Sequence, residues 1–216
     1  MTRRMRDAAF REQQVAKLRA KHIASINKLV EELRNPTAGL WAPYVAPMYG
    51  GTNARLLSVL RDPGPKTNTA HGGSGFLCME NDDATAERIA GLFSGAGISA
   101  GDIVPWNAYP WYINNRPTAA QLEAGVEPLR RLLQLLPKLR VVMLHGGSAH
   151  DGWKRLLRRH PLTAERALSV VETYHTSRQA FWHPDPTERQ RRAGHLGAAF
   201  RSASDVLGVG QAERPR

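Results

Sequence analysis

The sequence predicts an α/β protein with three layers, α/β/α, around a central four-stranded, mainly parallel sheet. Short apolar segments of strand length alternate with amphipathic segments of helix length along most of the chain. Polar and aromatic loops follow the apolar segments, whereas the connections after the helices carry no comparable cluster. Strands that alternate with helices form parallel sheets covered on both faces, so this order of elements predicts the fold class.

The expected strands are short and rich in Val, Ile and Leu, and amphipathic helices follow each of them. The strands are expected at residues 55–60, 102–106, 140–144 and 168–172. The helices are expected at residues 84–97, 118–136, 149–159 and 187–206. Gly97 ends the first of these helices, and Thr118 begins the next with capping-box spacing.

A long amphipathic helix is expected from about Arg6 to Leu33, because apolar residues recur there at three- and four-residue spacing. Asn35-Pro36 ends it, since the residue before a proline avoids the helical conformation. Such a helix packs on the main domain or, alternatively, contacts DNA. Three segments are therefore expected: residues 1–36 as this helix, 37–207 as the α/β/α domain and 208–216 as a flexible tail.

Charge and cysteine content narrow the classes of function. The formal net charge of +11 fits a polyanionic partner, nucleic acid first, or simply a basic soluble surface. The single cysteine, Cys78, excludes a disulfide framework and is expected to be a small buried hydrophobe. The sequence has neither a membrane-spanning apolar stretch nor the apolar segment of a signal peptide, so a cytoplasmic protein is expected.

Three loops that follow expected strands carry the candidate functional residues. The first carries Asp62 and Phe76, the second Asn107 and the last His175. Ligands of open parallel sheets bind beyond the carboxyl ends of the strands, so we expect these side chains to lie together. No dinucleotide or Walker motif follows the first strand, which argues against ordinary nucleotide cofactors.

Each of these residues also has an ordinary structural interpretation. Asp before Pro is a common turn former, Asn commonly caps a turn, and a single Phe is more often part of a core. Taken together, however, Asp62, Phe76, Asn107 and His175 supply a carboxylate, an aromatic surface, an amide and an imidazole. These are the groups needed to hold a base and to assist its departure.

The chain resembles the uracil-DNA glycosylase superfamily over about residues 55–203. In the best-known branch the first motif reads Gly-Gln-Asp-Pro-Tyr-His, and LRDPGP stands in its place here at 60–65. Ala-His-Gly precedes the stacking Phe of that branch, as Ala70-His71-Gly72 precedes Phe76 here. Asn107 closes a strand like the base-reading Asn of the family, and His175-Thr176-Ser177 stands where the family has His-Pro-Ser.

The resemblance implies a role for each matching position. Asp62 would orient water and stabilise the cationic sugar, and Phe76 would stack under the flipped base. Asn107 would read the pyrimidine edge, and His175 would hydrogen-bond the carbonyl oxygen of the departing base. The DNA-binding positions implied by the resemblance, among them the wedge at 178–179, are Lys66, Ser177, Arg178 and Gln179.

The chain departs from the family at two points. Gly64 stands where the best-known branch has the Tyr that excludes the methyl group of thymine, so exclusion of thymine is open. The iron–sulfur branches need four cysteines and this chain has one, so no cluster is expected. The activity that the resemblance implies needs no metal or other cofactor.

The resemblance implies a monomeric DNA glycosylase that removes a damaged base, uracil first, from double- or single-stranded DNA. We do not expect a membrane partner. The alternatives are a catalytically silent nucleic-acid-binding module of the same fold and an N-glycoside hydrolase of small nucleosides or nucleotides.

Overall fold

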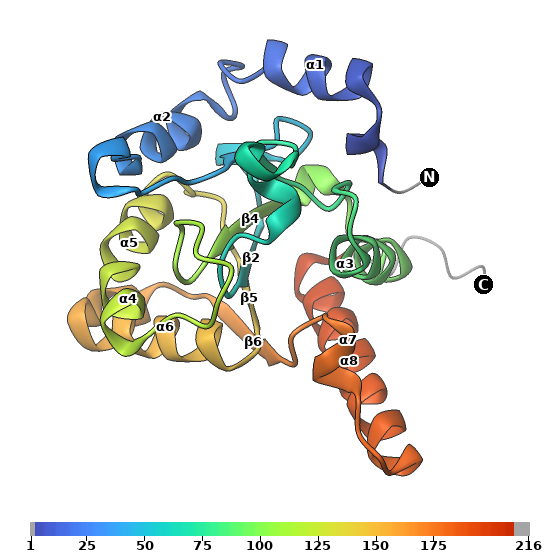
Figure 1. Ribbon diagram of the computed structural model, residues 1–216. Helices are drawn as coiled ribbons and strands as arrows, with labels where there is room; N and C mark the ends of the chain where they lie inside the picture. Colours follow the sequence, from blue (N-terminus) through green and yellow to red (C-terminus); the bar gives the residue numbers. More distant parts are fainter. Residues whose placement is uncertain (1–2, 210–216) are drawn as a thin grey trace.

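The computed structural model describes residues 3–209, and its centre is a four-stranded, all-parallel sheet (Figure 1). The strand order is β4-β2-β5-β6. The strands are β2 (Leu56–Leu60), β4 (Ile103–Asn107), β5 (Val141–His145) and β6 (Ser169–Thr173). All four lie within a residue of their predicted positions, because buried parallel strands appear in the sequence as short, continuous apolar runs. The predicted α/β/α fold is confirmed.

Helices cover both faces of this sheet (Figure 1). α3 (Ala84–Gly95) and α8 (Pro186–Leu207) lie on one face, where the Phe93 and Phe200 rings meet with centroids 4.8 Å apart. The opposite face is covered by α2 (Ala24–Leu33), α5 (Val126–Gln134) and α6 (Gly147–Arg159), with α4 (Ala119–Ala124) packed on α6. Of the predicted tail, residues 210–216 lie outside the described part of the chain.

The predicted long N-terminal helix is wrong, because the structure contains two helices there. α1 (Ala8–Ala16) and α2 are separated by a turn that brings Ile23 fully into the core and leaves Val15 55% exposed. The apolar spacing counted across residues 6–33 therefore belongs to two different faces. Asn27 fixes α2 to the body, since its side chain accepts from Val45 N at 2.9 Å and donates to Val45 O at 3.2 Å.

The predicted helix at 118–136 is also divided, into α4 and α5, at Gly125. A Cβ at Gly125 would lie 1.9 Å from the carbonyl oxygen of Ala108, so only glycine fits there. Pro128, in the first turn of α5, has no N–H to donate to the preceding turn. Capping-box spacing at Thr118 is confirmed and marks the start of α4.

A second, two-stranded parallel sheet was not predicted. It pairs β1 (Tyr44–Val45) with β3 (Phe76–Leu77), and Tyr44 lies opposite Phe76. Strands of two residues are too short to show any periodicity in a sequence. Their pairing fixes the orientation of the loop that follows β2.

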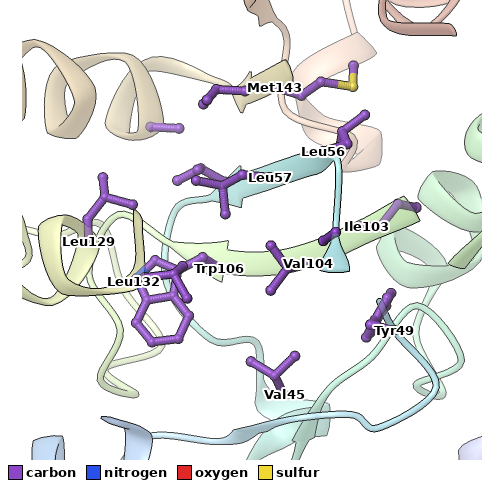
Figure 2. Packing of buried hydrophobic residues seen from close by; sticks show 14 of the residues in the cluster. Val45, Tyr49, Leu56, Leu57, Ile103, Val104, Trp106, Leu129, Leu132 and Met143 are labelled. Atoms are coloured by element: carbon purple, nitrogen blue, oxygen red, sulfur yellow. The ribbon is translucent and has the colours of Figure 1, made fainter. Parts of the chain in front are cut away.

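The buried core fills both sides of the main sheet. Figure 2 shows Leu57, Val104 and Trp106 from the strands together with Leu129 and Leu132 from α5. Successive side chains of a strand point to opposite faces, so Leu56, Ile103 and Met143 belong to the face covered by α3 and α8. Within residues 3–209, no helix is both long and apolar enough to cross a membrane.

Replacing Phe200 by Ala tests whether α8 is part of this core. Phe200 is 1% exposed, and its ring contacts Phe93, so Phe200→Ala should lower the free energy of unfolding by about 3–5 kcal/mol. Trp182→Ala is the control, because Trp182 is 70% exposed and should change that energy by less than about 0.5 kcal/mol. Equal effects of both variants in urea titrations would show that α8 is not held by this contact.

Candidate active site

A cavity of about 640 Å³ lies at the carboxyl ends of the strands, on the face covered by α3. Its wall includes Asp62 after β2, Asn107 at the end of β4, His145 at the end of β5 and His175 after β6. Each of the four strands of the sheet therefore contributes a polar side chain to one space. This is the place where open parallel sheets bind ligands.

Asp62 carries its carboxylate into this cavity on a short loop. The loop is anchored to the neighbouring strand end, because Tyr109 N donates to Arg61 O at 3.0 Å. The Asp62 side chain is 2% exposed, and Arg61 Nε donates to its Oδ1. The other oxygen, Oδ2, is buried and has no hydrogen-bond partner among the described residues.

Burial raises the pKa of the Asp62 carboxyl group above its ordinary value, and the Arg61 guanidinium opposes this shift. The backbone N–H groups of Asn115 and Asn114 also oppose this rise in the pKa of Asp62, although neither forms a hydrogen bond with full geometry. Because the charged form is costly in this position, Asp62 is a better proton acceptor than an exposed aspartate.

Asn107 presents an unsatisfied amide. The side chain is 3% exposed at the end of β4, opposite Leu60 of β2. Its Oδ1 is buried and lacks a hydrogen-bond partner within residues 3–209. Buried polar atoms are nearly always paired, so this oxygen is suited to accept a hydrogen bond from a ligand.

His175 is held as a neutral imidazole. Burial, with a smaller contribution from the Arg61 charge, lowers the pKa of His175 to about 4. Its Nδ1 accepts the backbone N–H of Ser177 at 3.1 Å, so the ring proton is on Nε2. Gly146 packs closely against the base of this side chain, since a Cβ there would lie 3.0 Å from the Cβ of His175.

Most of the predicted DNA-binding positions also line the cavity. Lys66, Ser177 and Gln179 do so, whereas Arg178, the first residue of the short helix α7 (Arg178–Phe181), does not. Gly64 lines it too, and a Cβ there would meet nothing within 4 Å. Its φ of −76° suits any residue, so the sequence is glycine here without a backbone requirement.

Phe76 is not brought to the cavity. It is 2% exposed and packs against Tyr44, with ring centroids 6.4 Å apart. The pairing of β3 with β1 turns Phe76 into the core, and Leu77, the next residue along the strand, lines the cavity instead. The segment that was expected to supply an aromatic ring to the cavity therefore supplies an aliphatic side chain.

His145 is a cavity residue that the sequence analysis missed. It is completely buried, and its Nε2 lies 3.0 Å from Ser58 Oγ. Burial, followed by the charges of His175 and His150, lowers the pKa of His145 to about 3. The available signal was a histidine directly after the apolar strand expected at residues 140–144.

The remaining chemistry of the cavity wall is limited. Burial raises the pKa of the Cys78 thiol to about 12, so Cys78 lines the cavity as an inert thiol. Across residues 3–209, no cluster of three or more His, Cys, Asp or Glu side chains is arranged to hold a metal ion.

The sequence was compared with models of known protein families and with curated protein sequences. The model of the Uracil DNA glycosylase superfamily matches residues 47–196, which contain all four strands of the main sheet and the polar residues of the cavity. A search of curated protein sequences found no match. Because the matched segment covers more than half of the sequence and includes the whole cavity edge of the sheet, the chain belongs to the uracil-DNA glycosylase superfamily.

Proposed function

We propose that the protein is a monofunctional DNA glycosylase that accepts a flipped-out damaged base, uracil first, and hydrolyses its N-glycosidic bond to leave an abasic site. Membership of the superfamily supports DNA-glycosylase-type chemistry in general. The observation that supports this cavity as the site is that Asp62, Asn107 and His175 line it together. Two of them carry a buried oxygen that has no partner in the described chain.

Asp62 acts on the sugar and on the attacking water. The bond between C1′ and the base nitrogen breaks, and its electron pair leaves with the base. The water oxygen forms the new bond to C1′, and a water proton passes to the Asp62 carboxylate. The ionised carboxylate also stabilises the positive charge that develops on the sugar. The raised pKa of Asp62 favours this proton transfer.

His175 stabilises the leaving base. Its Nδ1 is occupied by the Ser177 N–H, so Nε2–H is the donor of the neutral ring. That N–H donates to the carbonyl oxygen on which negative charge develops as the base leaves. A pKa of about 4 keeps the ring neutral at pH 7, so it supplies a hydrogen bond without transferring a proton.

Asn107 and the basic charge account for substrate binding. The Asn107 side chain has an acceptor and a donor for one edge of a base, and its Oδ1 is free of protein partners in the described structure. A base reaches a buried cavity only after it has left the duplex, which costs a few kcal/mol. The net charge of +11 attracts the phosphate backbone of DNA, and this attraction offsets the cost of flipping the base.

Asp62→Asn tests the proposed chemistry. The variant should excise uracil about 10²–10⁴-fold more slowly, because the amide cannot accept the water proton. Excision is measured on labelled oligonucleotides as strand cleavage after alkali, and binding by anisotropy should persist. The Tm should not fall, because the raised pKa shows that the ionised carboxylate is disfavoured in the folded chain. Asp151→Asn is the control, because Asp151 lies on α6 outside the cavity; an unchanged rate for Asp62→Asn would remove Asp62 from the mechanism.

The same assay on the unaltered protein separates the three functions considered. Oligonucleotides carrying uracil, hypoxanthine or a G·T mismatch should give alkali-sensitive product with at least one lesion. Salt-dependent binding without abasic product would instead identify a silent binding module. Release of base from free uridine, with indifference to DNA length, would identify a hydrolase of small nucleosides.

Gly64→Tyr tests the open space beside the catalytic loop. Gly64 lines the cavity and a Cβ there would meet no atom within 4 Å, so a Tyr side chain has room to narrow the site. The resemblance places here the Tyr that excludes the methyl group of thymine. Activity on thymine or other 5-substituted pyrimidines should fall at least about tenfold more than activity on uracil. Gly194→Tyr is the matched control, because Gly194 is equally open but lies on α8 away from the cavity. An equal loss on both bases would contradict a gatekeeping position.

Arg61→Gln tests the electrostatic coupling of Arg61 to Asp62 and His175. Asp62 must be ionised and His175 neutral, so the excision rate falls as the pH drops through their pKa values. Arg61 lowers both pKa values, so its removal should raise both and move the acid limb to higher pH. Single-turnover rates from about pH 4 to pH 8 should show this shift. Arg130→Gln on α5, away from the cavity, should leave the profile unchanged, and a downward shift for Arg61→Gln would be evidence against this coupling.

A further inference from the structure

A second, smaller hollow of about 100 Å³ adjoins the main cavity. The two spaces share Lys66 and Asn81 in their walls. The hollow lies between the N-terminal segment (residues 3–16) and the loop after β2. Its polar lining comprises Arg6, Arg11, Lys66, Ser74, Asn81 and Asp82. It therefore combines residues outside the matched segment 47–196 with residues inside it.

The N-terminal segment is fixed on the body by burial and ion pairs. Met5 is 4% exposed, and its backbone N–H donates to Glu80 O at 3.0 Å. Arg3 reaches Asp82 at 3.1 Å and Glu87 at 2.8 Å. Several partly buried contacts over a few residues make this a docked segment, in contrast to an isolated surface pair.

Three cationic side chains line the hollow, and two of them are held in place. Arg6 pairs with Asp82 at 2.6 Å, and Arg11 donates to the backbone oxygens of Met5 and Arg6 at 2.6 and 2.9 Å. The Lys66 ammonium has no hydrogen bond or ion pair within residues 3–209. Asp82, already shared with Arg3, is the one carboxylate among the lining residues, so the hollow is positive.

We propose that this hollow binds one backbone phosphate of the DNA strand beside the flipped nucleotide. The inference rests on the proposed function only in taking DNA as the substrate. Held guanidinium groups and a free ammonium are the donors that bind phosphate oxygens. A phosphate of the strand whose base enters the main cavity must lie near its mouth, and Lys66 belongs to both spaces.

The inference gives the N-terminal segment a role in binding beyond packing. Arg6 and Arg11 enter the hollow because Arg3 and Met5 hold the segment beside residues 80–87. The DNA strand would then be bound by the loop after β2 on one side and by the N-terminal segment on the other.

Binding to DNA that lacks the charge of a single phosphate tests the proposal. Oligonucleotides with a non-hydrolysable deoxyuridine analogue and one methylphosphonate, moved stepwise along the strand, are titrated by anisotropy. The unaltered protein should lose about tenfold in affinity at one position next to the analogue. Lys66→Ala and Arg11→Ala should bind the unmodified DNA about tenfold more weakly and be indifferent to that same methylphosphonate.

Matched variants separate this contact from general charge. Lys138→Ala removes one lysine at the opposite, amino-terminal edge of the sheet, where its ammonium contacts Asn53 at 3.0 Å. It should keep the full sensitivity to the methylphosphonate, as should Lys66→Arg, which retains the charge. Thermal melts of each variant exclude a loss that is due to unfolding. The slope of log K against log salt should fall by about 1 in Lys66→Ala.

Three results would overturn the proposal. The first is a flat methylphosphonate profile for the unaltered protein, and the second is an unchanged profile in Lys66→Ala and Arg11→Ala. The third is stabilisation by inorganic phosphate at constant ionic strength that needs Lys66, without any methylphosphonate effect, which would identify a site for free phosphate. Since the DNA is not cleaved in this experiment, its outcome is independent of whether the protein excises uracil.

Discussion

The common edge of the parallel sheet is the constraint on which the site depends. Parallel strands all end on the same side, so β4, β2, β5 and β6 deliver Asn107, Asp62, His145 and His175 to one cavity. Their separation in the sequence becomes unimportant once the register is fixed. The register in turn depends on the apolar strand residues, which in β2, β4 and β5 are buried on both faces between two layers of helices. The core thus fixes the positions of the four polar side chains that line the cavity.

Burial sets the protonation states in this cavity, and one arginine links them. The pKa of Asp62 is raised and that of His175 lowered by the same loss of water, so the site holds a carboxylate that accepts a proton readily and an imidazole that stays neutral. Arg61 acts on both groups, because its positive charge lowers the pKa of each. The buried oxygens of Asp62 and Asn107 that lack hydrogen-bond partners within residues 3–209 lower the stability of the free protein. A ligand that supplies hydrogen bonds to them recovers this energy, which is why such atoms mark a binding site.

The sequence was sufficient for the sheet, the layers and three of the four polar residues at the strand ends, because these depend on local apolar pattern and on topology. It was insufficient where contacts with residues far along the chain determine where an element breaks or which way a side chain points. The division of the N-terminal helix depends on Ile23 reaching the core, and the break at Gly125 depends on contact with Ala108. Phe76 was expected under a base because of the resemblance to the family, but its orientation is set by pairing with Tyr44, which no periodicity shows.

Phe76 then has a different importance from the one its position in the sequence suggested. Its carbonyl oxygen accepts from the Asn81 side chain at 2.9 Å, and Ser74 Oγ donates to Asn81 Oδ1 at 2.6 Å. Asn81 is 2% exposed and stands in the wall between the main cavity and the second, smaller hollow. By burying its ring, Phe76 anchors the short segment that turns Leu77 toward the cavity and Ser74 toward the hollow. Phe76 therefore acts through its backbone, since its carbonyl oxygen holds Asn81 in the wall that separates the two spaces.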